Sequence, residues 1–177
     1  MAFSRMLCKE LQEWKNSPFR KPLVIRGARQ VGKTTAITEF GKEFDTFIYL
    51  NLELAADRRI FESNLPAASV LQRIYLEKGT QKQGDTLIFI DEIQNSPKAV
   101  ELMRYFYEDF PDLFVISAGS LLEIMIDTHK ISFPVGRVEY RYLFPLSFLE
   151  YLGALDEQKA ITAFSTLPVP DWAQDRL

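Results

Sequence analysis

Short, mostly apolar runs alternate with amphipathic stretches along the chain. The runs at residues 22–25, 46–50, 86–90 and 113–116 end in small or polar residues, which is typical of buried strands. Apolar residues at helical spacing predict helices over 3–14, 34–44, 55–63, 67–78 and 98–110, and the first of these places Cys8 on its apolar face. A fifth strand is expected at 135–143, followed by two closing helices at 147–152 and 156–165.

This alternation predicts the fold class. Strands that are apolar on both faces indicate a mainly parallel sheet with helices on both sides, so we expect an α/β fold of three layers, α-β-α. The chain has 177 residues, which suits one ordinary domain. We find no internal repeat in it.

Composition and charge narrow the class of protein. About half of the residues are apolar (47%) and the net charge is −3. The charge does not favour a domain whose whole surface binds nucleic acid, although a local basic patch is compatible with it. The single cysteine excludes an internal disulfide and points to a reducing compartment. No apolar run approaches the length of a membrane span and no signal peptide precedes the first helix, so we expect a cytoplasmic protein without membrane contact.

The strongest motif follows the first predicted strand and opens a helix. It matches G-x-x-x-x-G-K-[ST], the P-loop pattern, in which backbone N–H groups curl around phosphate oxygens. Lys33 is expected at the β- and γ-phosphates of ATP, and the Thr34 hydroxyl is expected to bind Mg²⁺. The Arg29 side chain is expected to point outward. The residues expected to hold the nucleotide are Gly27, Ala28, Arg29, Gln30, Val31, Gly32, Lys33, Thr34 and Thr35.

A second motif ends the apolar strand at 86–90 with two carboxylates. The strand delivers Asp91 to the carboxyl edge of the sheet, where ligands bind in open α/β folds. Asp91 is therefore expected to hold Mg²⁺, through its water shell, while Glu92 orients and deprotonates the attacking water. Without the P-loop, such a pair is equally typical of a helix N-terminus.

A third, weaker signal is the small-residue segment after the strand at 113–116. If that strand lies between the two motif strands, a polar residue at its tip faces the γ-phosphate. Ser120 is the first choice for this role and Ser117 the second. A small-residue turn that starts a helix is the alternative.

Together these segments resemble a known family. The blocks that carry the resemblance are residues 27–34, 89–94 and 118–120, and Gly136-Arg137 followed by 143–151. They are similar to the AAA-type ATPase domain of a bacterial and archaeal family whose members usually carry a further C-terminal domain of unknown function. The resemblance implies a five-stranded core sheet in the order 5-1-4-3-2 and a sensor role for Ser120. The family more often has threonine at the position of Ala118.

The resemblance also divides the chain. It implies a nucleotide-binding domain over 1–167, with 168–177 starting a linker to a C-terminal domain that this chain lacks. The composition of 168–172, Pro-Val-Pro-Asp-Trp, is itself typical of a linker.

Gly136-Arg137 falls where related ATPases have an arginine finger. A guanidinium that reached the γ-phosphate from a neighbouring subunit, or by a fold-back of the chain, would stabilise the transition state. Arg141 is an alternative candidate for the arginine finger. An ordinary surface arginine is the remaining interpretation of Arg137.

These features predict an enzyme that binds ATP with Mg²⁺ and releases ADP, with hydrolysis coupled to a conformational change in the C-terminal domain or in an unidentified protein partner. The acid pair at 91–92 favours hydrolysis over a kinase reaction, because a base beside the metal ligand activates water. Two alternatives stay open: a nucleotide-dependent switch with negligible turnover, and a DNA-linked motor or loader. ATP is preferred to GTP because no N-K-x-D tetrapeptide occurs in the chain.

Overall fold

The computed structural model describes residues 6–63, 65–120, 134 and 136–165. Its centre is a parallel sheet in the order β2-β3-β4-β1-β5, which is the expected order 5-1-4-3-2 counted from the other edge. The expected fold class is thus confirmed. In chain order the strands are β1 (Leu23–Arg26), β2 (Thr46–Asn51), β3 (Thr86–Asp91), β4 (Phe114–Gly119) and β5 (Glu139–Tyr142).

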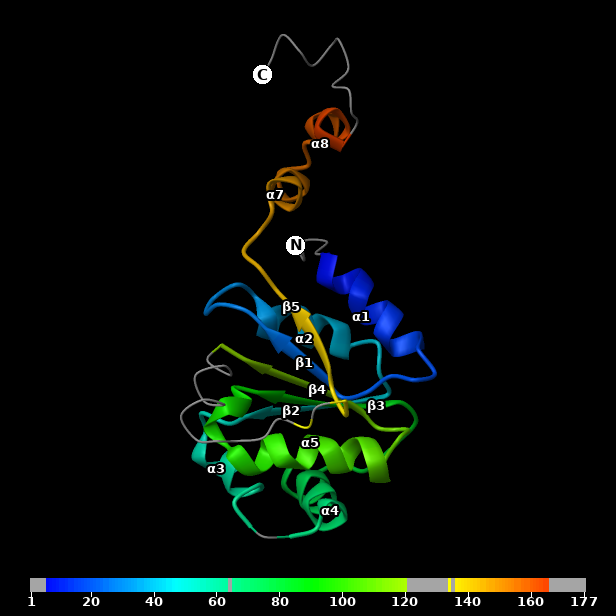
Figure 1. Cartoon of the computed structure of the whole chain (residues 1–177), viewed down its shortest axis with the longest axis vertical. Coiled ribbons are helices and arrows are strands. Elements are labelled where there is room, and N and C mark those ends of the chain that lie inside the picture. Colours follow the sequence, from blue (N-terminus) through cyan, green and yellow to red (C-terminus); the bar gives the residue numbers. More distant parts are fainter. Residues whose placement is uncertain (1–5, 64, 121–133, 135, 166–177) are drawn as a thin grey trace.

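Helices cover both faces of this sheet (Figure 1). Helices α1 (Met6–Asn16) and α2 (Lys33–Gly41) pack on one face, around a core that includes Trp14, Ile37 and Phe89. Helices α3 (Ala55–Arg59), α4 (Ala67–Glu77) and α5 (Pro97–Asp109) lie on the other, around a second core that includes Phe61 and Phe106. Because each strand contributes alternate residues to the two cores, β3 and β4 are buried along their whole length.

Three local predictions need correction. The last strand begins at Glu139, later than expected, because Gly136 takes a positive φ of 78° and forms a turn with Arg137. The β4 strand is longer than expected and runs through Gly119. Cys8 is exposed and does not belong to the core that its helix forms with Leu7 and Leu11.

The last helices leave the sheet. Helices α7 (Phe148–Ala154) and α8 (Gln158–Ser165) follow β5 and project away from the strands (Figure 1). A capping box fixes the start of α7, in which the Ser147 hydroxyl and the Glu150 side chain each bind the other residue's backbone N–H. The same Glu150 carboxylate accepts a hydrogen bond from the Met6 backbone N–H at 3.1 Å, which ties α7 to α1. The expected linker at 168–177 lies outside the described residues.

Among the described helices, none has the length and apolar character to cross a bilayer.

Candidate functional site

The P-loop connects the end of β1 to the start of α2. Gly32 is the N-cap of α2, in the left-handed region (φ 94°, ψ 21°), so the first N–H groups of the helix open toward the loop. Gly27 has a φ of 150°, and a Cβ atom there would lie 2.2 Å from the Leu143 carbonyl oxygen at the end of β5. The loop therefore needs glycine at both positions and packs directly against the neighbouring strand.

Lys33 is the first residue of α2, directly after the loop, and is 6% exposed. Its ammonium group donates hydrogen bonds to the backbone carbonyls of Gly27 (2.9 Å) and Ala28 (2.7 Å). Burial lowers the pKa of Lys33, and the negative charges of Glu92 and Asp91 act in the opposite direction. An ammonium group has three donors, so it can hold the loop and a phosphate oxygen together.

The two motifs meet at Asp91, which is 4% exposed. The Thr34 hydroxyl donates to Asp91 Oδ2 at 2.7 Å, and the Glu92 backbone N–H donates to Oδ1 at 3.0 Å. A hydroxyl and a carboxylate are hard oxygen donors of the kind that Mg²⁺ prefers when phosphates supply further ligands. Thr34 and Asp91 therefore fit the metal that the sequence predicts. Among the described residues, no cluster of three or more His, Cys, Asp and Glu side chains could hold a metal by itself.

Glu92 has an unusual backbone for a glutamate, with φ 51° and ψ 45°. It stands between β3 and the short 3₁₀ helix η1 (Ile93–Asn95), and its half-exposed side chain receives a hydrogen bond from the buried Gln94 amide. Left-handed backbone in a residue other than glycine is uncommon and concentrates at functional sites. The sequence predicted the role of Glu92 but gave no signal for its tether to Gln94.

Tyr49 is a second residue that the sequence did not identify. Its hydroxyl donates to Asp91 Oδ2 at 3.2 Å from the neighbouring strand β2. Burial, followed by the charge of Asp91, raises the pKa of Tyr49 to about 12. The alternation of β2 was the available signal, because a parallel partner strand places Tyr49 and Asp91 on one face.

Ser120 lies just beyond Gly119, which pairs with Arg26 immediately before the loop. Its hydroxyl oxygen is buried and has no hydrogen-bond partner in the described part of the chain, so it can still bind a ligand or water. Ser117 is fully buried, and its register partners Val24 and Ile90 belong to the core on the face away from α2. Ser120 is thus the better placed of the two, although its sensor role remains a prediction.

The structure places Arg137 at the amino end of the parallel strands, opposite the carboxyl end at which the P-loop lies. It precedes β5, whose first residue Glu139 pairs with Leu23 at the start of β1. Its guanidinium binds the Glu108 carboxylate at 2.8 Å, near the end of α5, and this contact raises the pKa of Arg137 and lowers that of Glu108. Arg137 is therefore not close to the phosphate loop of its own chain, and the two interpretations that stay open are a finger for a neighbouring subunit and an ordinary surface arginine.

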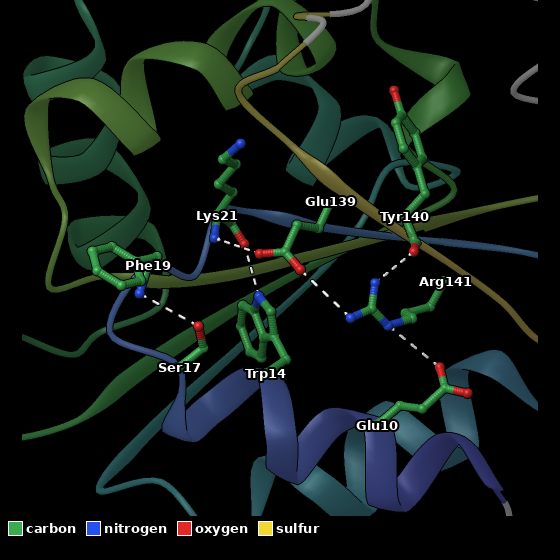
Figure 2. Close-up of polar contacts among 8 residues, drawn as sticks. All are labelled: Glu10, Trp14, Ser17, Phe19, Lys21, Glu139, Tyr140 and Arg141. Atoms are coloured by element: carbon green, nitrogen blue, oxygen red, sulfur yellow. Dashed lines mark hydrogen bonds and ion pairs between the residues drawn. The ribbon is translucent and has the colours of Figure 1, made fainter.

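Arg141, the alternative finger, serves a local network (Figure 2). Its guanidinium forms ion pairs with Glu10 of α1 (3.4 Å) and Glu139 (3.5 Å) and donates to the Tyr140 carbonyl at 2.9 Å. The Glu139 carboxylate also accepts the Lys21 backbone N–H at 3.0 Å. These contacts assign Arg141 to the attachment of α1 to β5.

Asn51 and Glu53, at the carboxyl end of β2, take part in a turn. The Asn51 side chain accepts the Glu53 backbone N–H at 2.9 Å, and the Asn51 backbone N–H donates to the buried Asp57 carboxylate at 2.8 Å. Asp57 is also paired with Lys78 at 2.6 Å. This network supports the loop after β2, next to Asp91.

A cavity of about 490 Å³ lies between the start of α4 and α5. Its lining includes Phe61, Pro66, Leu102 and Tyr105, and it shares no residue with the P-loop. The nucleotide site predicted at the P-loop is therefore separate from this cavity.

Known proteins resemble the chain in sequence and in fold. The family described as the AAA domain matches residues 19–152. A Walker-type ATPase of Pyrococcus abyssi has a TM-score of 0.57 and 20% identity, over 90% of this chain and 59% of that one. Drosophila ORC bound to DNA has a TM-score of 0.48 and 12% identity, over 80% of this chain and 90% of that one. A comparison with curated proteins finds no significant match.

These likenesses carry different weight. The Pyrococcus structure supports the fold alone at this identity, and the chain spans less than two thirds of its length. The likeness to the Drosophila structure is too distant to support an argument. The family match covers most of the chain and includes the P-loop, the acid pair and β5.

Proposed function

The chain belongs to the AAA domain family, and from this premise we propose that it binds ATP with Mg²⁺ and hydrolyses it to ADP and phosphate. We further propose that hydrolysis drives a conformational change in a C-terminal domain or a protein partner. One observation carries the proposal: the Thr34 hydroxyl lies 2.7 Å from Asp91 Oδ2, which joins the P-loop to the acid pair. Lys33 and Glu92 flank that contact in sequence.

Each residue then has a role in the reaction. The loop N–H groups and the Lys33 ammonium hold the β- and γ-phosphates. Thr34 would hold Mg²⁺ directly and Asp91 would hold it through its water shell, and the metal would neutralise charge on the phosphates. Glu92 orients a water molecule and accepts its proton while the water oxygen bonds to the γ-phosphorus and the bond to the β-phosphate oxygen breaks. The Ser120 hydroxyl is proposed to position that water or the γ-phosphate.

The first test compares ATP turnover and ATP binding in three variants. Glu92→Gln should abolish turnover and keep calorimetric ATP affinity, because it removes the base and leaves the loop intact. Lys33→Ala should weaken binding itself, because it removes a charge from the phosphates. Glu101→Gln is the matched control, since this exposed carboxylate on α5 pairs only with Lys98 in the described part of the chain.

The results separate the candidate functions. Tight binding with equally negligible turnover in wild type and Glu92→Gln would replace hydrolysis with a nucleotide-dependent switch. Absence of any ATP binding would refute the proposal altogether. Stimulation of wild-type turnover by duplex DNA would identify a DNA-linked motor.

We also propose that Arg137 acts on the nucleotide of a neighbouring subunit. Its position at the amino end of the strands, away from the P-loop of its own chain and with the side chain 45% exposed, supports this arrangement. Mixing Arg137→Ala with Glu92→Gln should restore turnover, because each inactive subunit supplies what the other lacks. Arg104→Ala is the control, since Arg104 is also exposed and also binds Glu108, at 3.0 Å. If the mixture stays inactive although both variants assemble, Arg137 has no such role.

A further inference from the structure

Tyr49 lies on β2, the strand next to β3, and its hydroxyl contacts Asp91 of the acid pair. In β2 it pairs with Phe89 of β3, and the two rings lie against each other with centroids 5.4 Å apart. Phe47 and Phe89 belong to the core beneath α2, so the alternation of both strands turns Tyr49 toward the face on which α2 begins. The Tyr49 side chain can therefore reach Asp91 while it remains 36% exposed.

The Asp91 carboxylate receives hydrogen bonds from three donors in the described part of the chain. The hydroxyls of Thr34 and Tyr49 converge on Oδ2 at 2.7 and 3.2 Å, and the Glu92 N–H binds Oδ1 at 3.0 Å. A carboxylate that is 4% exposed needs such donors, because burial removes the water that would otherwise bind its oxygens. Together they set the orientation of both carboxylate oxygens.

The two hydroxyls differ in what else they do. The Thr34 oxygen is also the proposed metal ligand, so this hydroxyl has two roles: it donates to Asp91 and it would bind the metal. The Tyr49 ring is fixed from the side by Phe89, and its hydroxyl has Asp91 as its hydrogen-bond partner. Tyr49 thus has the geometry of a support for the carboxylate.

We propose that Tyr49 is a positioning residue for the metal: its hydroxyl holds the Asp91 carboxylate in the orientation that binds Mg²⁺ with the nucleotide. This inference rests on the proposed function, because it assumes that Asp91 holds the metal. It adds a residue from β2, the strand at the edge of the sheet, to a site otherwise built by the P-loop and β3.

Calorimetry with ADP tests the proposal without turnover. Tyr49→Phe removes one oxygen and keeps the ring on Phe89, so the fold is preserved. We expect its affinity for ADP to fall about tenfold in Mg²⁺, the size of one lost hydrogen bond to a charged group, and to stay unchanged in EDTA. Tyr105→Phe, at an exposed tyrosine of α5, is the matched control and should change neither affinity.

A second measurement separates positioning from a general structural role. The Mg²⁺ concentration for half-maximal ATP turnover should rise about tenfold in Tyr49→Phe, whereas kcat at saturating Mg²⁺ stays at the wild-type value. Equal losses in Mg²⁺ and in EDTA, or no loss in Mg²⁺, would overturn the role of Tyr49. Wild-type protein that binds ADP equally well with and without Mg²⁺ would instead overturn the metal site of the proposed function, and this inference with it.

Discussion

Replacement of Gly27 by alanine tests how tightly the P-loop is packed. The added Cβ would lie 2.2 Å from the Leu143 carbonyl oxygen and 3.2 Å from its carbon. That carbonyl cannot retreat easily, because the Leu143 N–H donates to the Arg26 carbonyl at 2.8 Å and the Leu143 side chain lies in the core. The substitution must therefore displace backbone.

Two costs add in Gly27→Ala. The φ of 150° is a conformation that side chains rarely adopt, which costs about 1 to 3 kcal/mol. The overlap with β5 costs about 1 to 3 kcal/mol more, as in an overpacked core. We expect the free energy of unfolding to fall by about 2 to 6 kcal/mol, and ATP binding to be lost because the loop changes shape.

Gly79→Ala isolates the first cost. Gly79 also has a positive φ, of 61°, but a Cβ there would meet nothing within 4 Å. We expect a loss of about 1 to 2 kcal/mol from the backbone conformation alone. Urea unfolding measures both variants, and m-values equal to wild type would show that the comparison is valid. If the two losses agree within about 0.5 kcal/mol, the contact between the loop and β5 carries no energetic weight and the reasoning fails.

Three further predictions concern the surroundings of the acid pair. Lys78→Met should lower the free energy of unfolding in urea by about 3 kcal/mol, because it leaves the buried Asp57 carboxylate without its cation; a loss below about 1 kcal/mol would contradict this. The pKa of Tyr49 is raised from 10.0 to about 12, so its contribution to stability is complete below pH 10 and is lost as the pH rises toward 12. Urea melts at pH 9 and 11 should show a smaller loss in Tyr49→Phe than in wild type, and identical losses would show that this tyrosine does not contribute. Gln94→Met should reduce ATP turnover about tenfold at unchanged ATP affinity, because the Glu92 carboxylate loses its donor; full turnover would remove Gln94 from the site.

The sequence allowed prediction of those parts of the site that depend on local pattern. The P-loop and the acids at 91–92 each follow an apolar strand, so their place at the carboxyl edge follows from periodicity and the rules of parallel sheets. The strand order came from family resemblance, because apolar runs such as 86–90 and 113–116 carry no information about their neighbours. The roles predicted for Ser120 and Arg137 stay predictions.

The contacts of Tyr49 and Gln94 depend on features that the sequence pattern does not fix, although the alternation of β2 does indicate the face of Tyr49. The first depends on the register between β2 and β3, and the second on the left-handed backbone at Glu92. Tertiary packing also explains two of the corrected predictions. It sets the turn at Gly136, which delays the start of β5, and it sets the rotation of α1 about its axis, which leaves Cys8 exposed.

The contact of Gly27 with Leu143 has a mechanical consequence. The phosphate loop and the segment that leads to α7 and α8 share one junction, because Leu143 both closes β5 onto Arg26 and limits the space of the loop. If the proposed conformational change moves the loop toward Leu143, the backbone at this junction has to move with it. Helices α7 and α8, which project from the sheet beyond this junction, would then be displaced, and the hydrogen bond from the Met6 N–H to Glu150 would oppose that displacement (Figure 1).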